Sequence, residues 1–154
     1  GFNYRMSEIH AAIGVEQMKK LPSFLFKRKK NFNHLEAGLK KIQNVTVLQQ
    51  PFDDRFNSSH YCLGMLLDQS IVKKRSKIME ALGQKGVGTS IYYPQPVPRM
   101  TYYKQKYGYD EKRFINASTI SDSMVALPVG PHLELSDMNY IIQSIKEVMD
   151  KLNV

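Results

Sequence analysis

Two segments with strand-like residues follow one another with no helix between them, and this order strongly constrains the fold. Residues 45–48 form a short run rich in β-branched side chains that ends at Pro51, and residues 60–67 are almost continuously apolar. Neighbouring strands that lack a crossover helix favour an antiparallel or mixed sheet, with the helices of the chain packed on it. Because the second segment is continuously apolar, we expect it to be the central strand.

Residues 1–43 have the apolar periodicity of helices. Ser7 is a suitable N-cap, and apolar side chains recur at helical spacing from Ile9 to Leu21. Proline is tolerated at the start of a helix but not inside one, so Pro22 predicts a bend at residues 21–23. We therefore expect two consecutive helices before the first strand.

Further helices and strands are expected in the second half of the chain. Residues 71–82 have helical spacing, and residues 89–93 suit a strand that must stop where three prolines follow. Residues 124–127 suit a last short strand, and Ser136 is a suitable cap for a final helix with an apolar stripe over residues 141–152. The assembled pattern predicts an α+β fold with a short, mostly antiparallel sheet.

The charge of the chain is strongly positive. Its 22 Lys and Arg residues exceed its 14 Asp and Glu residues, and residues 27–30 are all basic. Such a run is typical of a solvated helix face. The alternative is a standalone basic α+β interaction module that binds an acidic partner or nucleic acid through residues 27–30. No recognisable nucleic-acid-binding motif accompanies this run, so we do not favour nucleic-acid binding.

Other common classes of site find little support in the residues. The single Cys62 allows no internal disulfide and is compatible with a reducing, cytoplasmic location. The four histidines have no metal-ligand spacing, so we expect no metal site. No run approaches the ~20 apolar residues that span a bilayer, and we expect no membrane association. No nucleophile motif appears either, so we assign no catalytic residue to this chain.

Asn3, Tyr4 and Arg5 precede the first expected helix. An Asn amide and an Arg guanidinium beside the free N–H groups of a helix N-terminus suit a phosphate or another anion. The alternative, an Asn turn followed by a surface Arg, is favoured when these three residues are considered alone.

Three segments resemble a known family. GFNYRMSEIHAAIGVEQMKKL at residues 1–21 is similar to the motif of nucleotide-sugar aminotransferases of the DegT and StrS type, the group that includes perosamine synthase. GVGTSIYYPQPVPRMTYYKQKYGY is similar to the family's glycine-rich entry into a strand that ends in a Tyr-Pro-x-Pro segment. MVALPVGPHLELSDMNYIIQSIKEV resembles its terminal strand and helix, so the resemblance extends over the whole chain.

The resemblance implies a PLP-dependent enzyme with the aspartate aminotransferase fold. Such an enzyme works as a homodimer in polysaccharide biosynthesis and transfers an amino group from glutamate to a nucleotide-linked keto sugar. The resemblance places the aldimine lysine in a large domain upstream of residue 1. It implies interdomain helices over residues 1–43 and a small C-terminal domain over residues 44–154. We therefore expect this chain alone to be inactive and not to bind PLP stably.

The resemblance also implies site residues. Asn3 and Arg5 are expected to reach the PLP phosphate or the substrate across the dimer interface. Tyr4 is expected to contact the nucleotide sugar. Tyr92 and Tyr93, at the end of the expected strand, are candidates for the same site, because an aromatic ring can stack while its hydroxyl forms a hydrogen bond. Many family members have His at the positions of Tyr92 and Pro98, so the substrate contacts of those two positions do not carry over.

Overall fold

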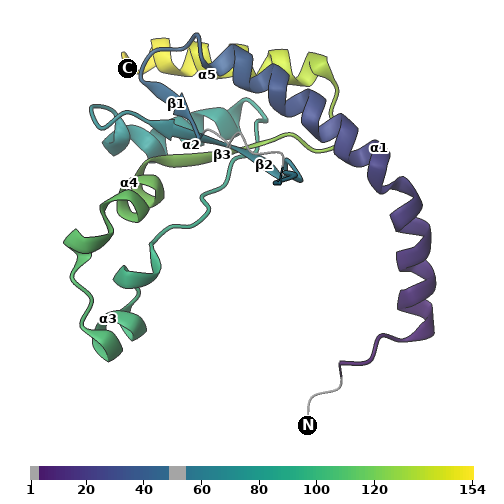
Figure 1. Ribbon diagram of the computed structural model, residues 1–154. Coiled ribbons are helices and arrows are strands. Elements are labelled where there is room, and N and C mark those ends of the chain that lie inside the picture. Colours follow the sequence, from purple (N-terminus) through teal and green to yellow (C-terminus); the bar gives the residue numbers. More distant parts are fainter. Residues whose placement is uncertain (1–3, 49–54) are drawn as a thin grey trace.

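Three strands form a single antiparallel sheet in the computed structural model, which describes residues 4–48 and 55–154 (Figure 1). The strands are β1 (Val45–Val47), β2 (Cys62–Leu67) and β3 (Met124–Pro128). They lie in the order β1-β2-β3, with both pairs antiparallel. The α+β fold with an antiparallel sheet and a central second strand is confirmed.

One helix, α1 (Glu8–Leu39), spans the region where two helices were expected. Its N-cap is Ser7, as predicted, because the Ser7 hydroxyl accepts a hydrogen bond from the His10 backbone N–H at 3.3 Å. Pro22 lies inside the helix, so the prediction of two helices was wrong. A proline removes one backbone hydrogen bond, and a helix that curves can relieve the clash of its ring with the preceding turn. Figure 1 shows that α1 is curved.

The hydrophobic core lies between the sheet and three helices. The C-terminal half of α1 and α5 (Leu135–Lys151) lie side by side over the sheet, and α2 (Arg75–Gln84) packs against α5 (Figure 1). Helix α1 buries an apolar stripe, and α5 buries the stripe expected from its sequence. The two stripes consist of Phe32, Leu35 and Leu39 in α1 and Ile141, Ile145, Val148 and Met149 in α5.

Helix α5 begins one residue before its expected cap. Its N-cap is Glu134, and the Glu134 backbone N–H donates a hydrogen bond to the Asp137 side chain at 2.8 Å. The Glu134 side chain accepts from the Asp137 backbone in return, which completes a capping box. Ser136 therefore lies within the first turn, and its assignment as the cap was wrong.

The strand expected at residues 89–93 is absent from the described sheet. Only Ser90 pairs there, through two backbone hydrogen bonds of 2.8 and 3.2 Å with Ala126 of β3. The prolines that follow lack backbone donors, and the chain leaves the sheet after Ser90. It then forms η2 (Val97–Arg99), α3 (Thr101–Tyr107), η3 (Glu111–Phe114) and α4 (Ile115–Ser123), which project from the sheet before β3 begins (Figure 1).

None of the helices among the described residues combines the length and the apolar character that a membrane crossing requires.

Candidate functional site

A pocket of about 300 Å³ opens at the end of the sheet where strand β2 begins and strand β3 ends. Helix α1 contributes one wall, and the segment around the Ser90 bridge contributes another. The turn that follows β3 closes a third side. The lining consists of Arg28, Tyr61, Cys62, Gly88, Ser90, Tyr92, Ala126, Leu127, Pro128, Val129, Gly130, Pro131 and His132.

Two tyrosines meet at this pocket. The rings of Tyr61 and Tyr92 are 6.1 Å apart between centroids and tilted by 47°. A hydrogen bond with Tyr92 raises the pKa of Tyr61 above its ordinary value. Both rings combine an apolar face with a hydroxyl, which suits the recognition of a ligand that has both apolar and polar surfaces.

The guanidinium of Arg28 lies above the Tyr61 ring, with its central carbon 5.9 Å from the ring centroid. This geometry is a cation–π contact. Lys27, the preceding residue, pairs instead with Glu134 at 3.2 Å. Of the basic run at residues 27–30, only Arg28 is half-buried, while its three lysines are exposed as expected of a solvated helix face.

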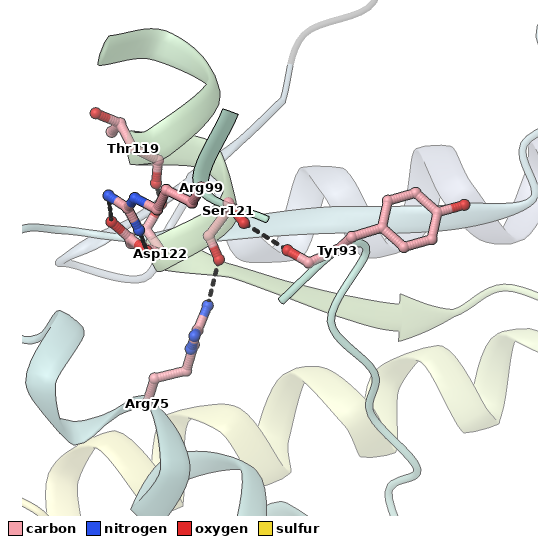
Figure 2. Close-up of polar contacts among 7 residues, drawn as sticks. Arg75, Tyr93, Arg99, Thr119, Ser121 and Asp122 are labelled. Carbon is pink, nitrogen blue, oxygen red and sulfur yellow. Dashed lines mark hydrogen bonds and ion pairs between the residues drawn. The ribbon is translucent and has the colours of Figure 1, made fainter. Parts of the chain in front are cut away.

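A polar network holds the segment that carries Tyr92 and Tyr93 (Figure 2). The Ser121 hydroxyl donates a hydrogen bond to the Tyr93 backbone carbonyl at 2.5 Å. Arg75 of α2 donates to the Ser121 backbone carbonyl at 2.6 Å. Figure 2 shows the Tyr93 ring pointing away from Ser121, so the network holds the backbone of Tyr93 and leaves its ring free of these bonds.

An ion pair fixes the other end of the same segment. Arg99 donates two hydrogen bonds to the Asp122 carboxylate, at 2.6 and 2.8 Å (Figure 2). These bonds hold the pKa of Asp122 below its ordinary value. Residues 93 and 99 are thus both attached to the C-terminal turn of α4, which leads directly into β3. This attachment positions Tyr92 at the pocket.

The site residues predicted from the sequence occupy separate places. Tyr92 lines the pocket, whereas Tyr93 is 71% exposed and is absent from the lining. Tyr4 and Arg5 are exposed and lie just before α1, at the end of that helix farthest from the sheet (Figure 1). Asn3 lies outside the described residues. Within the described residues of this chain, the structure therefore does not bring Arg5 together with Tyr92.

Tyr61 and His132 were not predicted as site residues, and Arg28 was named only as one member of the basic run of the alternative interaction module. They come from three separate parts of the chain and converge only through tertiary packing. The basic run pointed to a solvated surface, and Tyr61 lies in the segment that was expected to be a buried strand. No local sequence signal distinguishes these three residues.

The described residues do not fit PLP on their own. The lining of the pocket includes neither a lysine, whose amine would attach the cofactor, nor a carboxylate to pair with its pyridine nitrogen. No group of three or more His, Cys, Asp or Glu side chains in the described part of the chain could hold a metal ion.

The fold is that of part of a sugar aminotransferase. The structure of Helicobacter pylori PseC, an aminotransferase involved in the biosynthesis of pseudaminic acid, matches with a TM-score of 0.86 and 24% identity. The match covers 98% of this chain and 39% of PseC. The PLP form of a putative sugar aminotransferase from Streptococcus pneumoniae matches with a TM-score of 0.83 and 24% identity, covering 96% and 37% of the two chains.

The model of the DegT/DnrJ/EryC1/StrS aminotransferase family matches residues 1–146, so the chain belongs to this family. The resemblance noted in the sequence is thereby confirmed. A UDP-4-amino-4,6-dideoxy-N-acetyl-β-L-altrosamine transaminase from Campylobacter jejuni is 24% identical over 152 residues, which cover 99% of this chain and 39% of the relative. The chain thus spans about two fifths of the length of the curated relatives it matches.

Proposed function

We propose that this chain is the C-terminal part of a PLP-dependent enzyme that transfers an amino group from glutamate to a nucleotide-linked keto sugar. The family match over residues 1–146 carries the proposal. The relative from Campylobacter jejuni, named as a transaminase of a UDP-linked amino sugar, supports the substrate class. The chain covers about two fifths of the length of its relatives. This supports the view that a large domain supplies the rest of the enzyme.

In this proposal the tyrosines contact the nucleotide sugar. Tyr92 reaches it from the pocket and the exposed ring of Tyr93 from beside the pocket, whereas Tyr4, next to Arg5, reaches the nucleotide sugar of the neighbouring subunit. A tyrosine ring can stack on a base or a sugar while its hydroxyl donates or accepts a hydrogen bond. The polar network at Ser121 and Asp122 keeps the backbone of this segment in place.

Asn3 and Arg5 bind the PLP phosphate or the substrate of the neighbouring subunit in the proposed homodimer. A guanidinium recognises a phosphate with two parallel hydrogen bonds. Because Arg5 directly precedes α1, whose N-terminal end lies away from the sheet (Figure 1), a contribution to a different subunit is compatible with its position.

PLP supplies the electron sink of transamination, and the protein orients the substrate. The lysine that attaches PLP belongs to the large domain in this proposal, since the described pocket has none. The 154-residue chain alone is then inactive, although it can hold its substrate-contacting tyrosines in place.

A comparison of two polypeptides tests the proposal. After incubation with PLP and dialysis, the 154-residue chain should keep no visible absorption band that borohydride abolishes. The full-length polypeptide should keep such a band. Dialysis removes PLP that has bound loosely to surface lysines. A dialysis-stable, borohydride-sensitive band in the 154-residue chain would contradict its proposed lack of a PLP lysine.

The role of Arg5 is tested in the full-length enzyme with Arg5→Gln and with Arg113→Gln as a matched control. Both variants remove one positive charge from an exposed side chain. Loss of a charged phosphate contact should weaken PLP binding about 10- to 100-fold in Arg5→Gln. Equal PLP affinity together with an equal KM for the nucleotide sugar in the two variants contradicts the role of Arg5. A panel of keto sugars then identifies the amino acceptor.

A further inference from the structure

The pocket at the end of the sheet contains a buried hydrogen-bond donor that has no acceptor among the described residues. The Nε atom of Arg28 is shielded from solvent and has no hydrogen-bond partner in the described part of the chain. Burying a charged donor without a hydrogen-bond acceptor costs folding free energy. Arg28 is therefore suited to bind a ligand that supplies the acceptor. The contact of Arg28 with the Tyr61 ring supplies no hydrogen-bond acceptor to Nε, which stays without a partner.

Charges near the pocket favour an anion as that acceptor. The described lining contains no carboxylate, so Arg28 has no counterion there. Burial, and after it the charge of Lys29 on the same helix as Arg28, lowers the pKa of His60. A concave site with an excess of one charge concentrates ligands of the opposite charge.

Other side chains of the lining can complete the site. Ser90, Tyr92 and His132 all carry groups that donate hydrogen bonds to an oxyanion. His132 lies directly over Gly130, where an added Cβ would be only 2.5 Å from the imidazole Cε1. Glycine at position 130 therefore permits the ring to lie over the turn.

We propose that Arg28 anchors a binding site for a small oxyanion, a carboxylate or a phosphate group, in the pocket that Tyr61 and Tyr92 line. The volume of about 300 Å³ is at the small end of the range for ligand sites and suits one compact group rather than a whole nucleotide sugar. The proposal does not rest on transamination, because it concerns this chain without PLP.

The test is a titration of the isotopically labelled 154-residue chain, followed by the NMR shifts of its backbone amides. Three probes are added separately: inorganic phosphate, L-glutamate and the uncharged sugar glucose. We expect phosphate, glutamate or both to shift the amides of residues 88–92, Gly130 and His132, and glucose to leave them unchanged. The anion that binds with the higher affinity shows whether the site prefers a phosphate or a carboxylate. Absence of shifts at these amides with both anions overturns the proposal without any variant.

Two variants with the same loss of charge separate a specific site from general attraction to a basic protein. Arg28→Gln should weaken anion binding about 10- to 100-fold, because it removes a charged hydrogen-bond donor. Arg113→Gln, outside the pocket, should bind as the parent chain does. Equal weakening in both variants would overturn the proposal.

Arg28→Lys keeps the charge but loses the planar fork, so it should retain part of the affinity.

Discussion

At the scale of single residues, the Arg99–Asp122 ion pair is the clearest device that fixes the candidate site. Its two hydrogen bonds are parallel and bidentate, the geometry that makes an arginine–carboxylate pair most specific. Both side chains are partly exposed, however, which limits the energy that the pair contributes. The pair is therefore expected to position the segment after Tyr93 more than to stabilise the fold.

A double-mutant cycle tests this expectation. Arg99→Gln, Asp122→Asn and the double variant should give a coupling energy of about 1 kcal/mol or less in the free energy of unfolding. The measurement is urea denaturation of the four proteins. A coupling of several kcal/mol would show that the pair stabilises the fold and does more than position the segment.

The same pair should make stability depend on pH. The pKa of Asp122 is lower in the folded chain than its ordinary value, chiefly because of the hydrogen bonds from Arg99. The stabilisation is therefore present above the pKa of the unfolded chain, about 3.9, and is lost as the pH falls through the folded pKa. Denaturation midpoints between pH 3 and pH 6 should show a smaller acid-induced loss in Asp122→Asn. An identical acid loss in parent and variant contradicts this assignment.

Sequence reasoning identified some of the site residues and missed others for a physical reason. Tyr92 was a candidate because it is an aromatic residue at the end of an expected strand, and the structure places it in the lining of the pocket. Arg28 and Tyr61 lie far apart in the sequence, and only the packing of α1 against the sheet brings them together. A basic run gives no local indication of which of its members turns inward.

At the scale of elements, the crossing of α1 and α5 depends on a glycine. A Cβ added at Gly38 would lie 2.2 Å from Cδ1 and 2.7 Å from Cγ1 of Ile142 in α5. Distances this short require the isoleucine or the helices to move. Gly14 in the same helix has no heavy atom within 4 Å of the position of such a Cβ.

Alanine substitutions at these two glycines should have opposite effects. Gly38→Ala should destabilise the chain by about 1–3 kcal/mol through overpacking. Gly14→Ala should stabilise it by about 0.5–1 kcal/mol, because alanine favours a helix interior. Thermal unfolding of both variants measures the difference. In an Ile142→Ala background the cost of Gly38→Ala should shrink, and an unchanged cost there would refute the proposed clash.

The helices and strands were predictable where the apolar pattern was regular. The stripe of α5 and the apolar run of β2 correspond to burial against the core. The bend predicted from Pro22 did not divide the helix, because a single proline weakens only one turn and the neighbouring turns of α1 keep their hydrogen bonds. The segment at Ser90 has strand-forming residues, but the pairing that it makes is set by its neighbour β3 and not by its own composition.

At the scale of the whole molecule, the part of α1 from Glu8 to Phe26 carries apolar side chains without a partner among the described residues. Five of the large apolar side chains in this part of the helix are 55–74% exposed. In the proposed enzyme this surface meets the large domain. The five residues are Ile9, Ile13, Val15, Met18 and Phe26.

Exposure of this surface should make the 154-residue chain self-associate. We expect light scattering to give a mass above that of the 17.8 kDa monomer at high concentration. Replacing Ile9 and Ile13 with Asp should restore the monomer, while the same change at the exposed polar residues Lys19 and Lys20 should have less effect. A monomeric parent chain at high concentration contradicts the expectation.

The sequence predicted the family and the α+β fold because the family motifs are spread along the whole chain. It could not define the pocket, whose walls come from α1, β2, β3 and the segment at Ser90. The division after residue 43 and the dimer stay predictions. The second half of α1, which lies before residue 43, packs in the same hydrophobic core as the sheet and α5.

The most direct measurement of the proposed function is a single-turnover assay of the full-length polypeptide loaded with PLP. Glutamate should change the absorption spectrum of the cofactor and release one equivalent of 2-oxoglutarate. A nucleotide-linked keto sugar should then restore the original spectrum and yield the amino sugar. The account is contradicted if glutamate leaves the spectrum unchanged, or if no nucleotide-linked keto sugar accepts the amino group.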